Sequence, residues 1–319
     1  MKALVVRGGA IAVEDVPLPT PDSDCLVRVS MAGICGTDLQ ILEGYAGFAG
    51  IPGHEFVGIV EAAPDADAHW VGKRVVGEIN VGCGRCAWCQ AGVKEHCTDR
   101  SVVGIRNRSG AFAEYVALPA TNLHHVPDTI SDRAAVFVEP IAAACRIFEQ
   151  MRVTPDSRIA VVGDGRMGLL VAQVVRTVAR GVTLFGRHEQ KLSVARSLGL
   201  TTVLASPASA SRFDIVVDVT GRPEGLTRAL QLVRPRGTVV MKSTFHGEAP
   251  IESWPIVVDE VTLIGSRCGP FEPAIALLAS KAVEVEPLIA RVTTLADYAA
   301  AFAEARTALK VLFDCRTGV

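Results

Sequence analysis

Two hydrophobic patterns follow one another along the chain. In the first third, short runs rich in β-branched residues alternate with glycine, proline and aspartate, and no helical period of useful length appears. These runs predict strands at Ala3–Val6, Ile11–Val16, Cys25–Met31, Phe56–Ala62, Val71–Ile79 and Gly110–Leu118. The first third is therefore predicted to form an antiparallel, barrel-like β unit.

After Ser131 the pattern changes. Ser131 offers an N-cap for an apolar helix from Asp132 to about Met151, and the run Arg158–Val162 is typical of a buried parallel strand. Further strands are predicted at Val182–Phe185, Thr202–Ala205, Asp214–Val219, Thr238–Lys242 and Val261–Gly265, and helices at Leu169–Ala179, Gln190–Leu198 and Pro223–Val233. This alternation predicts a doubly wound parallel sheet. A helix-rich tail, Glu272–Ser280 and Leu295 to about Thr307, is expected to end in a strand at Lys310–Asp314.

Composition narrows the class of partner. A chain of 319 residues is long for one core, so two domains are expected, and 49% hydrophobic with 21% charged residues is typical of a globular protein. A net charge of −2 gives no footprint for nucleic acid or an anionic membrane, and no stretch resembles a spanning helix or a cleaved leader. Nine cysteines, five of them in ligand-like spacings, indicate a reducing compartment, and we expect a cytoplasmic protein.

Four cysteines form the first candidate metal site. Cys83, Cys86, Cys89 and Cys97 are separated by two, two and seven residues, and four thiolates at such spacings can close a tetrahedron around one zinc ion. No position is left for water, so this zinc would be structural. A CxxC redox pair and an iron–sulfur cluster are the alternatives.

The segment from Gly33 to Glu55 holds the second candidate site. Cys35 offers a thiol and His54 an imidazole, and a catalytic zinc needs only three protein ligands and an open position. Asp38 is placed to take the second ring proton of His54, and Thr37 supplies a hydroxyl nearby. The alternative is a buried free cysteine and a hydrogen-bonded loop histidine.

Glu139 is the candidate for the third ligand. It lies among apolar residues of the predicted helix, next to Pro140, where a carboxylate is usually paired or bound to metal. An exposed glutamate on the polar side of the helix, or one that caps a turn after the proline, is the alternative.

A glycine-rich loop follows the strand Arg158–Val162 without a gap. Its residues include Gly163, Gly165, Met167 and Gly168, and an apolar helix continues from it. Between a strand and a helix, this spacing predicts a dinucleotide site with the pyrophosphate at the helix N-terminus.

Taken together, these features resemble the zinc-dependent medium-chain dehydrogenases, the superfamily of alcohol and polyol dehydrogenases. The resemblance covers essentially the whole chain and rests on motifs at Gly33–Asp38, Gly53–Glu55, Cys83–Cys97, Val138–Ala142, Gly163–Gly168 and Asp218–Gly221. It implies an α/β protein with a GroES-like, β-rich catalytic domain at residues 1–141 and 268–319. A Rossmann cofactor domain, a doubly wound parallel sheet, would be inserted at residues 142–267.

The same resemblance implies residue roles and a reaction. The catalytic zinc ligands would be Cys35, His54 and Glu139, with Glu55 as an alternate ligand, Thr37 as the hydroxyl that passes the substrate proton and Asp38 as the supporting acid. The implied reaction transfers hydride between an alcohol or polyol, or its ketone or aldehyde, and NAD(P), with zinc acting as a Lewis acid. Two zinc ions per chain are expected.

The resemblance also bears on the cofactor and on assembly. Lys310 would supply positive charge toward the cofactor pyrophosphate, with an exposed lysine as the alternative. A homodimer or homotetramer is implied, with the edge strand near Val261–Gly265 at the contact. Two other classes, a non-catalytic zinc or nicotinamide-binding protein and a reductase without catalytic zinc, are disfavoured by the presence of Cys35, His54 and Thr37.

The residues after the second strand of the cofactor domain predict NADP rather than NAD. An enzyme that prefers NAD usually places an acidic residue there for the ribose 2′-hydroxyl. This chain has Gly186, Arg187 and His188 instead, and arginine can bind a 2′-phosphate through its planar fork of donors. The alternative is a solvated Arg187 stacked on adenine, which is compatible with NAD.

Overall fold

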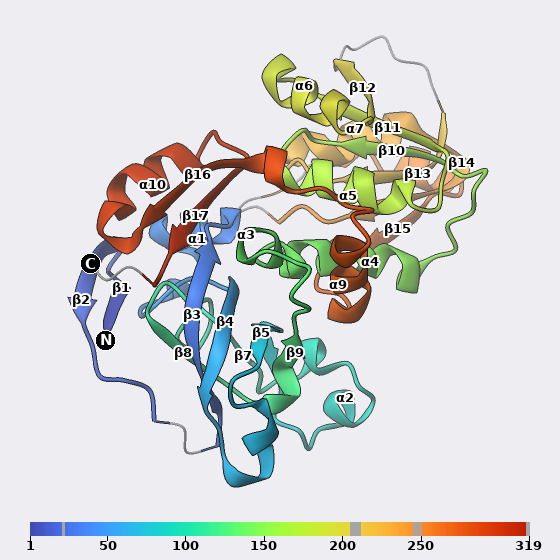
Figure 1. Cartoon of the computed structure of the whole chain (residues 1–319). Helices are drawn as coiled ribbons and strands as arrows, with labels where there is room; N and C mark the ends of the chain where they lie inside the picture. Colours follow the sequence, from blue (N-terminus) through green and yellow to red (C-terminus); the bar gives the residue numbers. More distant parts are fainter. Residues whose placement is uncertain (21–22, 205–211, 245–247, 249–250, 317–319) are drawn as a thin grey trace. The chain divides into compact units, whose positions relative to one another are not determined.

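The structure, a computed structural model, describes residues 1–20, 23–204, 212–244, 248 and 251–316. The chain divides into two compact units. The first comprises Met1–Glu139 and Ile289–Val319, and the second comprises Pro140–Leu288. The second unit is thus an insertion into the first (Figure 1).

The first unit is built on one large, mainly antiparallel sheet. Its strands lie in the order β16-β17-β3-β4-β5-β9, with β8 paired to β3, and only β16 and β17 are parallel neighbours among the described residues. Its strands are β3 (Cys25–Gly33), β4 (Glu55–Ala62), β5 (Arg74–Gly77), β8 (Tyr115–Leu118), β9 (Leu123–His125), β16 (Ile289–Thr294) and β17 (Lys310–Asp314). Two separate two-stranded sheets are formed by β1 (Lys2–Arg7) with β2 (Ala10–Asp15) and by β6 (Asn80–Val81) with β7 (Ser101–Val102). The predicted antiparallel β unit and the C-terminal strand are confirmed.

Short helices connect these strands, and one of them, α1, is not predicted by the sequence pattern. The helices are α1 (Gly36–Leu42), η1 (Tyr45–Gly47), η2 (Asp65–Trp70), α2 (Ala87–Gln90), η3 (Lys94–His96), η4 (Ala120–Asn122), α3 (Asp132–Ala135), η6 (Leu295–Asp297) and α10 (Tyr298–Ala305). The sequence shows no helical period of useful length in the first third and therefore does not predict α1. A capping box between Cys35 and Asp38 starts this helix, and two turns are too short to show a helical period.

The second unit contains the predicted parallel sheet. Its order, β12-β11-β10-β13-β14-β15, is that of a doubly wound dinucleotide fold, and every described pair is parallel. The strands are β10 (Arg158–Val162), β11 (Gly181–Gly186), β12 (Thr201–Leu204), β13 (Phe213–Asp218), β14 (Val233–Met241) and β15 (Thr262–Gly265). The predicted strand 202–205 is described up to Leu204, because Ala205 lies outside the described residues.

The second unit contains six α-helices and one short 3-10 helix among its described residues and at its boundary. They are α4 (Val138–Gln150), α5 (Arg166–Arg176), α6 (Glu189–Ser197), α7 (Pro223–Leu232), α8 (Trp254–Val258), α9 (Phe271–Ala279) and η5 (Glu286–Leu288). Helices α5 and α6 contact β10, β11 and β12, whereas α7 contacts β10, β13 and β14. The core between α7 and the sheet is fully apolar, with Val216, Ala229 and Val239 at 0% exposure. No helix among the described residues is of the length and apolarity needed to cross a bilayer.

The boundary between the units differs from the predicted domain bounds. The single helix expected from Asp132 to about Met151 is broken into α3 and α4, since Pro140 has no N–H to bond the carbonyl of Val136 and is tolerated only in a first helical turn. The inserted domain was expected to end at residue 267, but the compact unit extends to Leu288. Two hydrogen bonds tie Glu284 to the buried Gln173 on α5, at 2.9 and 3.0 Å.

Candidate active site and metal centres

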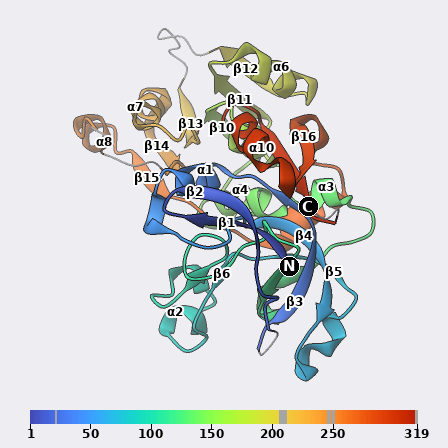
Figure 2. The same ribbon diagram turned by 90° about the vertical axis from the view of Figure 1, so that its left-hand side faces the viewer.

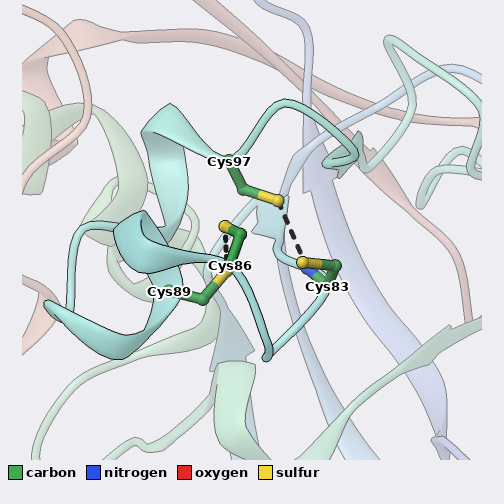
Figure 3. A group of neighbouring side chains, drawn as sticks. All are labelled: Cys83, Cys86, Cys89 and Cys97. Carbon is green, nitrogen blue, oxygen red and sulfur yellow. Dashed lines mark hydrogen bonds between the residues drawn. The ribbon is translucent and has the colours of Figure 1, made fainter.

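The four cysteines predicted as a zinc site lie together in one lobe of the first unit, around α2 (Figure 3). This lobe stands apart from β3 and β4 in both ribbon views (Figures 1 and 2). All four sulfurs lie within 4.8 Å of one another. The Cys86 and Cys89 sulfurs are 3.5 Å apart, and the N–H of Cys83 donates to the Cys97 sulfur at 3.4 Å. Four thiolates at one point saturate a tetrahedral ion, so the lobe fits a closed zinc site.

The lobe also favours the thiolate form of one cysteine. The N–H groups of Arg85 and Cys86 donate to the Cys83 sulfur and lower the pKa of this thiol to about 6. Burial acts in the opposite direction on Cys89 and raises its pKa to about 11. A bound cation would reverse the second shift, because thiols are deprotonated when they coordinate a metal.

The second group of possible ligands is mixed in chemistry and mostly buried. The sulfur of Cys35, a ring nitrogen of His54 and a carboxylate oxygen of Glu55 lie within 4.8 Å of one another. Only 3% of His54 and 1% of Glu55 is exposed. The pairing of Gly33 on β3 with Glu55 on β4 brings these chain segments together. Thiol, imidazole and carboxylate are ligands that zinc accepts, and three of them leave a fourth position open.

Asp38 joins the two segments that carry this group. Its side chain is buried, and its two oxygens accept hydrogen bonds from the N–H of Cys35 at 2.7 Å and of Gly53 at 3.3 Å. The same carboxylate lies 3.4 Å from Nδ1 of His54. Nε2 of the ring is therefore the nitrogen left for a metal. Burial disfavours the charged ring, but Asp38 and Cys35 outweigh it and raise the pKa of His54 well above its usual value.

Lys310 lies at this site rather than at the surface. Its ammonium forms an ion pair with Glu55, donates to the carbonyl of Ile34 at 3.2 Å and lies 5.5 Å from the centre of the Phe137 ring. Burial lowers the pKa of Lys310 to about 8, although the Cys35 and Asp38 charges act in the other direction. The alternative of an exposed lysine is wrong. Because its charge is balanced by Glu55 inside the first unit, the structure offers no support for the expected pyrophosphate contact.

Thr37 lies beside this group, whereas Glu139 is not one of its mutually close ligands. The Thr37 hydroxyl, on α1, is 3.8 Å from the Cys35 sulfur. Glu139 is half-buried in the first turn of α4, two residues after Phe137, which contacts Lys310. The set of mutually close ligand atoms contains Glu55 and not the predicted Glu139. Sequence reasoning missed the Glu55–Lys310 pair, and its only local signal is a lysine at the head of the apolar run Val311–Phe313.

The glycine-rich loop of the second unit forms a cradle between β10 and α5. Gly163 has φ +124°, which non-glycine residues rarely adopt, and a β-carbon at Gly168 would collide with the Gly163 carbonyl. A β-carbon at Gly165, the N-cap of α5, would meet nothing within 4 Å, so space is open at the helix N-terminus. Met167 is half-buried in the first turn of α5. This geometry fits a bound pyrophosphate.

The turn after β11 is held by an acid from this loop. Oδ2 of Asp164 accepts hydrogen bonds from the N–H groups of Arg187 and His188, both at 2.6 Å, and Oδ1 lies 3.0 Å from Nδ1 of His188. Burial raises the pKa of Asp164, but the bonds from His188 and Arg187 outweigh it and lower this pKa below its usual value. The side chain of Arg187 is exposed at the strand end. Sequence reasoning did not single out Asp164, whose signal is a carboxylate inside the glycine-rich loop.

Two family models match the chain. The alcohol dehydrogenase GroES-like domain matches residues 21–128, within the first unit, and the zinc-binding dehydrogenase model matches residues 167–280, within the second.

Curated and solved proteins give the same assignment. L-threonine 3-dehydrogenase of Streptomyces coelicolor is 35% identical over 98% of this chain and 99% of that protein, and sorbitol dehydrogenase of Halalkalibacterium halodurans is 29% identical over 98% of each. A zinc-binding dehydrogenase from Sinorhizobium meliloti 1021 bound to NADP has a TM-score of 0.89, 31% identity and 98% coverage of both chains. An alcohol dehydrogenase from Escherichia coli CFT073 complexed with NADH has a TM-score of 0.91, 25% identity and coverage of 98% and 99%.

The thiol–imidazole–carboxylate group of the β-rich unit and the phosphate cradle of the parallel sheet fit the alcohol and zinc-binding dehydrogenase models that match the chain. The chain belongs to the zinc-dependent medium-chain dehydrogenase superfamily. This membership confirms the predicted family, fold class and reaction class, an NAD(P)-dependent alcohol dehydrogenase.

Proposed function

We propose that this protein oxidises the hydroxyl group of a small alcohol or polyol, or reduces the corresponding carbonyl, at the Cys35–His54 site. The observation that carries the proposal is the buried group of Cys35, His54 and Glu55 with the Thr37 hydroxyl beside it. The test is a panel of alcohols followed by nicotinamide absorbance, together with the metal content of the protein. A protein that binds zinc and nicotinamide but oxidises no alcohol would be the non-catalytic alternative.

Each residue of the site has a distinct task in this proposal. A zinc ion held there would act as a Lewis acid on the alcohol oxygen. Thr37 receives the hydroxyl proton and passes it on, since its hydroxyl can accept and donate at once. Asp38 keeps His54 in the tautomer that presents Nε2 and fixes the backbone of both ligand segments.

The third ligand is proposed to be Glu139. Glu55 lies closer to Cys35 and His54, but its charge is already balanced by the buried Lys310. Glu139 follows directly on the chain segment that contacts Lys310, in the first turn of α4. Zinc content of Glu139→Gln and Glu55→Gln tests the choice. Full zinc occupancy in Glu139→Gln would assign the position to Glu55.

The four-cysteine lobe is proposed to hold a second, structural zinc. The support is the mutual distance of the four sulfurs and the thiolate character of Cys83. We expect elemental analysis to find two zinc ions per chain, one removed by chelator and one resistant to it. A single ion, or iron in its place, would contradict this.

NADP is proposed as the preferred cofactor. One solved neighbour is bound to NADP and another to NADH, so the preference must come from this chain's own residues. β11 ends at Gly186 and is followed by Arg187 and His188, with no acid among the three. The nearby Asp164 accepts hydrogen bonds from the N–H groups of Arg187 and His188. Arg187→Ala is expected to lower kcat/KM with NADP roughly tenfold and to change it little with NAD. A native preference for NAD would overturn the proposal.

A homodimer or homotetramer is proposed, with β15 at the contact. β15 is an edge strand of the parallel sheet, and α8 beside it exposes Trp254, Val257 and Val258 at 62%, 75% and 68% (Figure 2). Light scattering that shows a stable monomer at micromolar concentration would end this proposal. A cytoplasmic location is proposed as well, because none of the nine cysteines forms a disulfide.

A further inference from the structure

A pocket of the first unit lies outside the metal site. It is lined by residues 47–50 and 105–109 and has a volume of about 450 Å³. Pockets of roughly 300–1,000 Å³ are typical of small-molecule sites. All of its lining residues belong to the first unit. One segment begins at the end of η1, and the other precedes the strand β8.

The pocket is lined by two arginines, and only one of them forms an ion pair with a described acidic residue. Its lining includes Arg106 and Arg108 and no acidic residue. Arg108 is neutralised by Asp24 at 2.6 Å and also donates to the hydroxyl of Ser101. The exposed side chain of Arg106 makes no hydrogen bond or ion pair with another described residue. Asn107 and Ser109 add neutral donors to the same wall.

The loop that presents Arg106 is closed on itself. The backbones of Val102 and Arg106 exchange hydrogen bonds of 2.8 and 2.9 Å, and the N–H of Gly104 donates to Arg108 at 3.0 Å. Asn107 adopts a left-handed conformation, φ +53°, which asparagine tolerates better than most residues. A loop fixed in this way presents its arginine with little entropy left to lose on binding.

Both walls of the pocket are attached to the segment that leads into His54. Gly110 and Phe112 donate backbone hydrogen bonds to Ile51 and Pro52, at 2.7 and 3.0 Å. At Gly104 the loop touches Gly53, because a β-carbon there would lie 2.5 Å from the Gly53 carbonyl oxygen. Arg106 is two residues further on, so its Cα lies within about 7 Å of that of Gly104.

We propose that this pocket binds the anionic end of the substrate, a carboxylate or phosphate, while a hydroxyl further along the same molecule reacts at the Cys35–His54 site. The inference rests on the proposed function of that site and names its substrate class. Guanidinium groups bind carboxylate and phosphate oxygens through paired donors, and Arg106 is the pocket cation that pairs with no acid among the described residues. Acidic or phosphorylated polyols would then be preferred to neutral ones.

Three six-carbon substrates test this preference: sorbitol, gluconate and sorbitol 6-phosphate. We expect kcat/KM to be higher for at least one of the two anions than for sorbitol. The ratio of anionic to neutral kcat/KM should fall roughly tenfold in Arg106→Gln. Arg106→Lys should retain part of the ratio, since it keeps the charge without the fork. The anion whose kcat/KM falls in Arg106→Gln identifies the bound group, a carboxylate for gluconate or a phosphate for sorbitol 6-phosphate.

The matched control is Arg152→Gln, which removes an exposed arginine from the second unit and should leave the ratio unchanged. Anionic-to-neutral ratios below one for both gluconate and sorbitol 6-phosphate, or a preference for an anion that Arg106→Gln leaves intact, overturn the proposal. Calorimetric titration of the protein with gluconate and with sorbitol 6-phosphate, native and Arg106→Gln, reads the pocket without hydride transfer. If no alcohol is oxidised but these anions bind through Arg106, the proposed function fails while the pocket stands.

Discussion

The two candidate metal centres of the first unit differ in nearly every physical respect. The four-cysteine lobe is uniform in chemistry, lies on short turns around α2 and contains only one fully buried cysteine, Cys97. The Cys35–His54 site mixes three ligand types, lies where β3 and β4 meet, and is surrounded by the buried charges of Asp38 and Lys310. A uniform, saturated ligand set suits an ion that holds a fold together.

The mixed site is suited to chemistry because its neighbours control charge and position. Asp38 fixes two backbone segments and lies 3.4 Å from Nδ1 of His54, and Lys310 balances the charge of Glu55. The comparison therefore separates two kinds of dependence. Loss of the lobe should cost folding, while loss of the mixed site should cost activity.

The largest effect is expected from Cys97→Ser. A structural zinc contributes folding free energy directly, on the order of 10 kcal/mol of binding at neutral pH, so a missing ligand should prevent stable folding. Zinc content, solubility and thermal unfolding measure this. Cys145→Ser, which alters a buried thiol of the second unit, is the control and should remain folded and loaded with zinc.

For Cys35→Ser we expect the opposite result, a loss of activity without a loss of folding. Without its thiolate the open site should lose zinc and activity should fall by roughly a thousandfold or more, since Lewis-acid stabilisation is worth several kcal/mol. The chelator-resistant zinc and the unfolding temperature should stay close to native. A variant that unfolds like Cys97→Ser would erase the distinction between the two centres.

A smaller effect is expected for Asp38→Asn. Outer partners of a ligand histidine typically account for 10–100-fold in metal affinity or activity, and the amide cannot hold His54 as the carboxylate does. Activity against added zinc shows whether the loss lies in affinity or in turnover. Thr37→Ser, which keeps the neighbouring hydroxyl, should stay near native activity.

The smallest effect concerns the attachment of the lobe and depends on pH. Glu78 pairs with Lys94 of the lobe and with His124 on β9, both at 2.8 Å. Burial raises the pKa of Glu78, but these partners outweigh it and lower the pKa below 4.5. A lowered carboxyl pKa stabilises the fold above pH 4.5, and this contribution is lost as pH falls through the folded-state value.

The corresponding measurement compares thermal unfolding of native protein and Glu78→Gln from pH 7 to pH 3. At pH 7 the variant should be less stable by about 1 kcal/mol, or about 2 °C. Below pH 4.5 the two curves should converge. Zinc loss in acid affects both proteins alike, so it cancels in the difference. A difference that grows in acid would contradict the proposed role of Glu78.

The parts predicted from the sequence are those encoded locally. β10 and the glycine-rich loop adjoin in the chain, so Gly163, Gly165 and Gly168 carry their own structural context. The four cysteines likewise fall within fifteen residues, Cys83–Cys97, and their spacing alone predicts their convergence. Composition and hydrophobic periodicity also predict that one sheet is antiparallel and the other parallel.

The parts that could not be predicted depend on long-range pairing. Lys310 reaches Glu55 only because β17 pairs with β3, and the sequence around residue 310 does not predict this partner. The break between α3 and α4, just before Glu139, lies inside a continuous apolar pattern that predicts a single helix. The pocket around Arg106 also requires the turn at Gly104 to meet Gly53, fifty-one positions earlier in the numbering.

The pairing of β17 with β3 has a consequence for the synthesis of the chain on the ribosome. The hydrogen bond from Lys310 to Ile34 spans 276 positions, and the whole segment Pro140–Leu288 emerges before β17 exists. The inserted unit can therefore fold while the edge of β3 still lacks its neighbour, and an uncovered edge invites pairing with other chains. Nascent chains that end between residues 288 and 310 are expected to require chaperones even though their inserted unit already resists proteases.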